Sequence, residues 1–274
     1  MAEKMFGEAM SKLKGKSTRS SPKPVKTDVI EIPKEIYKAN PLVDLCIDVM
    51  YINKEPILNS IDKTVRFRAL VPLDSLQSEE YLKAFDKISR IYNDAGFRIK
   101  TFACDKAFEP IFEEVMDNPD LDIKLILVSA QAHVPEAERN NRTIKERFRT
   151  AFHRLPYKAL PRVMIRTLAM VCTDQLNYFP MKGGVSQYYS PRVIMQLPAL
   201  DYNAQFQFPF GAYVQAENET KPRNSMKGRI IDGIYLRPDK NNGHEIMSLK
   251  SGQVITRPKV TVSPMTSNVI NTVK

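Results

Sequence analysis

Three carboxylates that are far apart in the chain carry the chemistry that this sequence could perform. Asp48 lies inside the mostly apolar predicted strand 43–51, Asp105 follows the predicted strand 97–104, and Glu138 stands near the start of a helical pattern. A carboxylate within an apolar strand needs a partner, because burying a lone charge is costly. Carboxylates from separate elements that meet at one edge of a sheet can hold divalent cations for phosphoryl transfer.

Each of the three acids also has an ordinary structural interpretation. Asp48 could form a salt bridge or cap the end of its strand, and Asp105 could cap the helix that follows it. Glu138 in a first helical turn would meet the positive end of the helix dipole favourably. The set of three therefore indicates a catalytic site more strongly than any single member does.

A dense basic stripe follows Glu138 on the same predicted helix. With Glu138 at position i, its basic residues lie at i+4, i+7 and i+11. All four side chains therefore share one helix face: Glu138, Arg142, Lys145 and Arg149. An adjacent apolar face would pack on a sheet: Ala137, Ile144, Phe148 and Ala151. We expect the basic residues, together with Arg139, to follow a phosphate backbone. The alternative is a solvated face held by the ion pairs Glu138–Arg142 and Glu146–Arg149.

The elements that must position these residues alternate between strands and helices. Strands are predicted at 43–51, 64–71, 97–104 and 121–128, and helices at 78–95, 107–116, 135–155 and 162–178. This order predicts an α/β core domain over 41–197. Short strand-like runs at 206–216, 228–237, 245–250 and 254–262 predict a small β-rich module over 198–274. Residues 1–40 alternate Lys and Arg with Ser and Pro, which predicts a basic flexible tail.

Composition narrows the class of partner. The chain has 274 residues, a net charge of +10 and a pI near 9.4, so a nucleic acid is a more natural partner than a membrane. The alternative is a basic surface that only keeps the protein soluble. Cys46, Cys104 and Cys172 lack metal-ligand spacing, so we expect reduced core residues and no zinc site. Neither a membrane span nor a secretory leader is expected, which places the protein inside the cell.

Several stretches of the sequence resemble the integrase region of copia-type retrotransposon polyproteins. The similar stretches are LCIDVMYINKEP at 45–56, CDKAFEP at 104–110, AERNNR at 137–142, LNYFPMKGGVSQYYSPR at 176–192, FGAYVQA at 210–216 and LKSGQVITRPKV at 249–260. Together they span most of residues 41–265. The stretch around Glu138 matches the place where that family carries its catalytic glutamate.

The resemblance implies a ribonuclease H-like fold, in which helices flank a mixed five-stranded sheet. It implies a catalytic triad of Asp48, Asp105 and Glu138 that binds Mg²⁺ or Mn²⁺, processes the 3′ ends of element DNA and joins them to target DNA. It further implies a homo-oligomer that acts in the nucleus, reached from cytoplasmic particles. The alternative is an inactive remnant that still binds nucleic acid.

The sequence departs from the family pattern in three places. The interval between Asp105 and Glu138 is 32 residues (138 − 105 − 1), which is a few fewer than usual. The stretch SAQAHVPEAE replaces the usual flexible loop, and it brings Glu136 in as a competitor for the third acid. The zinc-binding N-terminal domain of the family is absent, because the histidines are His133, His153 and His244.

Overall fold

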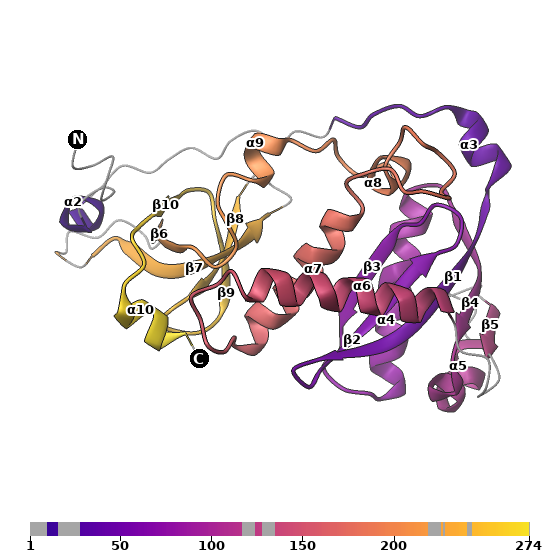
Figure 1. Cartoon of the computed structure of the whole chain (residues 1–274), viewed down its shortest axis with the longest axis horizontal. Coiled ribbons are helices and arrows are strands. Elements are labelled where there is room, and N and C mark those ends of the chain that lie inside the picture. The colour runs from indigo at the N-terminus through magenta and orange to yellow at the C-terminus, as the bar shows by residue number, and fades with distance from the viewer. Residues whose placement is uncertain are drawn as a thin grey trace. The chain divides into compact units, whose positions relative to one another are not determined.

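The computed structural model describes residues 10–15, 28–116, 124–127, 135–218, 226, 228–239 and 243–273. It divides into two compact units, each described by itself (Figure 1). The core unit contains residues 27–152 and 169–199, and the C-terminal unit contains residues 1–26, 153–168 and 200–274. Segment 153–168, which we expected in the α/β core, thus groups with the C-terminal unit.

The core unit contains a mixed five-stranded sheet in the order β3-β2-β1-β4-β5. Its strands are β1 (Leu42–Ile52), β2 (Glu55–Asp62), β3 (Arg68–Pro72), β4 (Arg98–Cys104) and β5 (Lys124–Leu127). Strands β1, β2 and β3 pair antiparallel, whereas β1, β4 and β5 pair parallel. The expected mixed α/β architecture with a five-stranded sheet is therefore present.

Strand β2 was not expected, and the pair β1–β2 explains why it forms. The hairpin turns at Asn53 and Lys54, which both have positive φ values of 48° and 70°. Two such residues give the turn a twist that matches the twist of the flanking strands. The polar residues Asn59 and Asp62 interrupt the apolar pattern of β2, so the strand is hard to recognise in the sequence. Both residues are fully buried in the folded chain.

Helices cover both faces of this sheet (Figure 1). On one face, α4 (Ser78–Asp94) buries Tyr81, Phe85, Ile88 and Tyr92 in the main hydrophobic core. On the other face, α6 (Pro135–Phe152) contacts β1 and β2, and its Ala137 packs against Cys46 and Ile61. The core unit also contains the short helices η1 (Lys106–Ile111), α5 (Phe112–Met116) and α8 (Pro191–Ile194). Helix α7 (Arg162–Leu176) begins in the C-terminal unit and ends in the core unit.

Part of the predicted tail 1–40 is ordered. Helix α2 (Met10–Gly15) and helix α3 (Lys34–Ala39) lie within it. The ring of Tyr37 lies 5.1 Å from the ring of Phe97, and its hydroxyl donates to the carbonyl of Ile194 at 3.0 Å. Residues 28–40 thus differ from the flexible segment that their composition suggested, because a few apolar side chains in them pack on the core. Residues 1–9 and 16–27 lie outside the described part of the chain.

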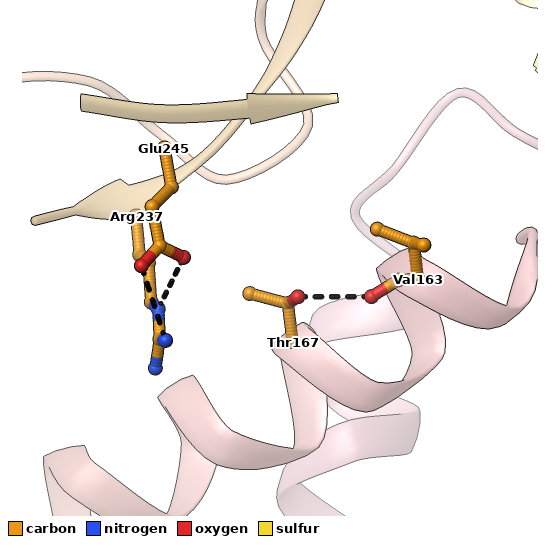
Figure 2. A network of polar contacts seen from close by, with 4 residues as sticks. All are labelled: Val163, Thr167, Arg237 and Glu245. Carbon is orange, nitrogen blue, oxygen red and sulfur yellow. Dashed lines mark hydrogen bonds and ion pairs between the residues drawn. The ribbon is translucent and has the colours of Figure 1, made fainter. Parts of the chain in front are cut away.

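The C-terminal unit contains an antiparallel five-stranded sheet in the order β10-β6-β7-β8-β9. Its elements are α9 (Tyr202–Gln205), β6 (Tyr213–Glu217), β7 (Ile230–Pro238), β8 (His244–Ser248), β9 (Val254–Arg257), β10 (Val260–Val262) and α10 (Ser267–Thr272). Arg237 in β7 and Glu245 in β8 form a two-pronged pair at 2.7 and 3.2 Å (Figure 2). Figure 2 also shows Thr167 bonded to the Val163 carbonyl, one turn back in α7. Among the described helices, none is long and apolar enough to cross a membrane.

Candidate active site

The register of β1 and β4 places two of the predicted acids side by side. Cys46 in β1 pairs with Ala103 in β4, and the two strands run parallel. Asp48 and Asp105 each lie two residues beyond that pair, so they are at the same level and on the same face. Neighbouring strands are about 4.8 Å apart, so the two aspartates are neighbours.

Glu138 lies in the first turn of α6, which packs on β1 and β2. Its neighbour Ala137 is fully buried in a small cluster with Cys46 and Ile61, against which Ala103 also packs. This cluster fixes the beginning of α6 on the sheet face that carries Asp48. Glu138 itself is exposed on the first turn of the helix.

Two of the three carboxylates act electrostatically on the third, Asp48. Burial raises the pKa of Asp48, and the negative charge of Asp105 raises it further. Hydrogen bonds from the backbone of Val49 and from Asn141 lower that pKa, and the charge of Glu138 raises it again. Asp48 is therefore a half-buried acid with two like charges near it, an arrangement that active sites often contain.

The competitor Glu136 faces a different partner. Its charge acts on Cys46, where burial raises the pKa of the thiol to about 11; the charge of Lys63 lowers that pKa and the charge of Glu136 raises it. Glu138, by contrast, acts on Asp48. Glu138 is therefore the better candidate for the third acid. Residues 128–134, which include His133, lie outside the described residues.

The donor atoms at this edge are all carboxylate oxygens, which are the protein ligands that Mg²⁺ and Mn²⁺ accept. In type and charge, Asp48, Asp105 and Glu138 fit such an ion. Within the described parts of the chain, however, no group of three or more His, Cys, Asp or Glu residues lies close enough to hold one. The acids are thus neighbours that interact at a distance, and metal binding stays an expectation.

The basic residues of α6 face away from the sheet. Arg139, Arg142 and Arg149 are exposed and Lys145 is half-buried, whereas Ile144 and Phe148 are buried. The helix thus has the two faces expected from its periodicity. Its exposed face offers positive charge next to Glu138.

Four polar residues close to the acids were missed by the sequence analysis. Asn141 donates to the Oδ2 atom of Asp48 at 2.6 Å, and it is joined in turn to Asn59, Asn140 and Arg68. One signal could have found Asn140, because it follows the buried Ala137 by three residues and precedes Ile144 by four. A polar residue on an apolar helix face needs a partner. Its partner in β2 could not be identified without the pairing of the strands.

The three cysteines are reduced core residues, as expected, since Cys46, Cys104 and Cys172 are all free and buried. Burial is the main cause that raises the pKa of each thiol, to about 11 for Cys172 and about 12 for Cys104. Such thiols are poor nucleophiles at neutral pH. They therefore contribute no chemistry to the site.

Comparisons with known proteins find similarity among solved structures. No family model matches the chain, and no curated protein matches it. Among solved structures, the chain is similar to the catalytic core domain of BIV integrase, with 14% sequence identity and a TM-score of 0.40. The match covers 56% of this chain and 92% of that one. A likeness of this size carries no argument for the site or its chemistry.

Proposed function

We propose that this protein is a polynucleotidyl transferase that joins DNA strands, with Asp48, Asp105 and Glu138 as its catalytic acids. The observation that supports the proposal is that the charges of Asp105 and Glu138 both act on Asp48. The acids come from three separate segments of the chain, so local structure does not require them to meet. The resemblance to copia-type integrase regions supports the same residues in the same roles.

The proposed reaction is a nucleophilic substitution at phosphorus, which is a hydrolysis when water attacks and a transesterification when a 3′ hydroxyl attacks; the proton of the attacking group is released and the departing oxygen takes one up. A water or a 3′ hydroxyl attacks a phosphodiester, one P–O bond forms, and the bond to the departing 3′ oxygen breaks. Mg²⁺ or Mn²⁺ held by the three acids would lower the pKa of the attacking hydroxyl and stabilise the departing oxygen. The exposed Arg139, Arg142 and Arg149, with Lys145, would hold the phosphate backbone along α6.

Such chemistry fits a nuclear protein that acts as a homo-oligomer on the ends of an element's DNA, and the proposal includes both. A second candidate function is nucleic-acid binding without catalysis. Two observations favour this alternative: Glu138 is exposed, and the described acids do not form a ready-made metal group. The same experiment separates the two.

The test is joining of duplex oligonucleotides with randomised ends, in Mg²⁺ or Mn²⁺, by the wild type and by Asp48→Asn. We expect the wild type to join DNA and the variant to lose at least about 1,000-fold in rate, since it removes a charge from the catalytic set. DNA binding should stay nearly unchanged, because the phosphate contacts lie on α6. Sequencing of the products identifies the joined ends.

The matched control is Asp94→Asn, which makes the same change at an exposed position at the end of α4, the helix on the opposite face of the sheet. It should leave the rate of joining unaltered. Equal joining by wild type and Asp48→Asn contradicts the assignment of Asp48. A wild type that binds DNA and never joins it supports the second candidate.

A further inference from the structure

A chain of polar side chains connects a buried cation to Asp48. Arg68 in β3 donates from Nε to Oδ1 of Asn140 at 2.6 Å, and Asn140 donates from Nδ2 to Oδ1 of Asn59 at 2.8 Å. Asn59 donates from Nδ2 to Oδ1 of Asn141 at 2.8 Å, and Asn141 donates to Oδ2 of Asp48 at 2.6 Å. We call these four hydrogen bonds the asparagine relay.

The direction of the four hydrogen bonds is set by Arg68, the first residue of the relay. A guanidinium can only donate hydrogen bonds, so Asn140 must turn its carbonyl oxygen toward Arg68. Its NH2 group then faces the carbonyl oxygen of Asn59. Asn59 and Asn141 are oriented in the same way, so each accepts with its side-chain oxygen and donates with its side-chain nitrogen. The last amide group therefore points at the carboxylate of Asp48, and every dipole in the relay is aligned from cation to anion.

Burial makes these bonds strong and makes gaps in them costly. Asn59 is 0%, Asn140 3% and Arg68 5% exposed. In a low-dielectric interior aligned hydrogen bonds reinforce one another, and a buried amide without a partner is destabilising. The backbone of Arg68 is held as well, because its N–H donates to Asn177 at 3.0 Å and its carbonyl accepts from Asn177 at 2.9 Å.

The relay also joins four elements of the core unit. It passes from β3 to α6, from α6 to β2, back to α6 and finally to β1. Asn140 and Asn141 follow Glu138 by two and three residues, so the bonds that orient Asp48 also fix the turn of α6 that carries Glu138. A shift of α6 along the sheet would break the relay at several points.

We propose that Arg68, Asn140 and Asn59 are positioning residues that act through Asn141 to hold the Asp48 carboxylate in place beside Glu138. This inference rests on the proposed function, since it assigns a role in the same site. The competing view is that the relay only packs α6 on the sheet. The two views predict different outcomes for a variant that reverses the relay and keeps the packing.

Asn140→Asp makes that change. The new carboxylate still accepts from Arg68, so the buried cation keeps its partner and the fold is retained. It can no longer donate to Asn59, so Asn59 and Asn141 turn their amides around. Asn141 then presents its oxygen to Asp48, which displaces that carboxylate. The matched control is Asn93→Asp, at an exposed position in α4.

We expect Asn140→Asp to unfold at the same denaturant concentration as the wild type or higher. Its kcat for DNA joining should fall by about 100-fold, as for a misplaced catalytic group, with little change in KM for DNA. Selective ¹⁵N-asparagine labelling should show the side-chain amide signal of Asn141 moving, although the changed residue does not touch Asp48. Asn93→Asp should change none of these quantities.

A folded Asn140→Asp variant with wild-type kcat overturns the proposal, and so does an unmoved Asn141 signal. If that variant does not fold, Asp48→Asn tests the relay from its other end, and the signals of Asn59 and Asn140 should then move as well. A change confined to Asn141 there overturns the relay. If the wild type joins no DNA, the proposed function fails, while the amide signals still decide whether the relay exists.

Discussion

At the scale of single residues, two aspartates on neighbouring strands differ in their surroundings. Asp48 in β1 lies on the face covered by α6, where Asn141 and the other acids surround it. Asp62 in β2 pairs with Leu45, so it lies on the face covered by α4. Its carboxylate accepts from the backbone N–H groups of Thr64 and Val65 at 2.8 and 3.0 Å, which closes the turn between β2 and β3. Asp62 therefore serves the fold, whereas Asp48 has the role in catalysis that we propose.

The pKa of Asp62 predicts how stability depends on pH. Burial raises this pKa to about 6 from 3.8, and the two backbone hydrogen bonds only partly offset the effect. The native state then holds a proton that the unfolded chain has released, so the free energy of unfolding falls as pH rises between those values. We expect a loss of about 2–3 kcal/mol between about pH 4 and about pH 7 from this residue.

Denaturant unfolding of the wild type and of Asp62→Asn at both pH values measures this contribution. The variant cannot ionise, so its pH dependence should be flatter by that amount. The raised pKa of Asp48 acts in the same direction in both proteins and therefore cancels. If the free energies of unfolding of the two proteins change equally with pH, folding does not raise the pKa of Asp62.

At the scale of elements, the helices could be predicted from their periodicity, whereas the pairing of the strands could not be predicted from the sequence. The patterns at 78–95 and 135–155 predicted α4 and α6 to within a few residues, because one apolar stripe on a helix is visible in a single segment. Strand β2 was hidden, because its buried Asn59 and Asp62 have hydrogen-bond partners elsewhere in the chain. For the same reason, the acids could be recognised in the sequence and the asparagine relay could not. Asp48 stands out in an apolar run, whereas the role of Arg68 depends on contacts across four elements.

Helix α6 yields a prediction about DNA binding. Neutralising Lys145 and Arg149 to Gln should weaken binding to any duplex, because these side chains would meet phosphates and not bases. If each meets one phosphate, the slope of log affinity against log salt should fall in magnitude by about 2. Fluorescence anisotropy over a range of salt concentrations measures this slope.

The control for that measurement neutralises Lys87 and Arg90, an exposed pair of the same composition on α4. Net charge changes equally in both double variants. An equal loss of slope in both would mean that overall charge, and not the face of α6, attracts DNA. A loss confined to the α6 variant locates the phosphate contacts there.

At the scale of the whole molecule, the chain builds its C-terminal unit from segments that are distant in sequence. Residues 153–168 belong to that unit although the core unit resumes at residue 169. The hydroxyl of Tyr157 donates to the carbonyl of Gly211 at 2.7 Å, which ties this segment to the loop before β6. No local pattern in 153–168 indicates this partner, so the order of predicted elements grouped the segment with 41–197, whereas contacts in the folded chain group it with the C-terminal unit.

Gly211 allows the strength of that tie to be measured. It has a φ of +84°, and a Cβ added to it would lie 2.7 Å from Cδ2 of Leu155. Gly211→Ala therefore combines backbone strain with a clash. Gly252 has a φ of +70° and nothing within 4 Å of an added Cβ, so Gly252→Ala carries the strain alone. We expect losses of about 2–4 kcal/mol and about 1 kcal/mol respectively in the free energy of unfolding.

The double variant Gly211→Ala, Leu155→Ala separates the clash from the loss of packing. Removing the Leu155 side chain makes room for the new methyl group, so the two changes together should cost less than the sum of the single changes. Such coupling requires segment 153–168 to pack against the loop before β6 in solution. Strict additivity, measured by denaturant unfolding of the four proteins in the cycle, would show that Leu155 and Gly211 are not in contact and that 153–168 does not belong to the C-terminal unit.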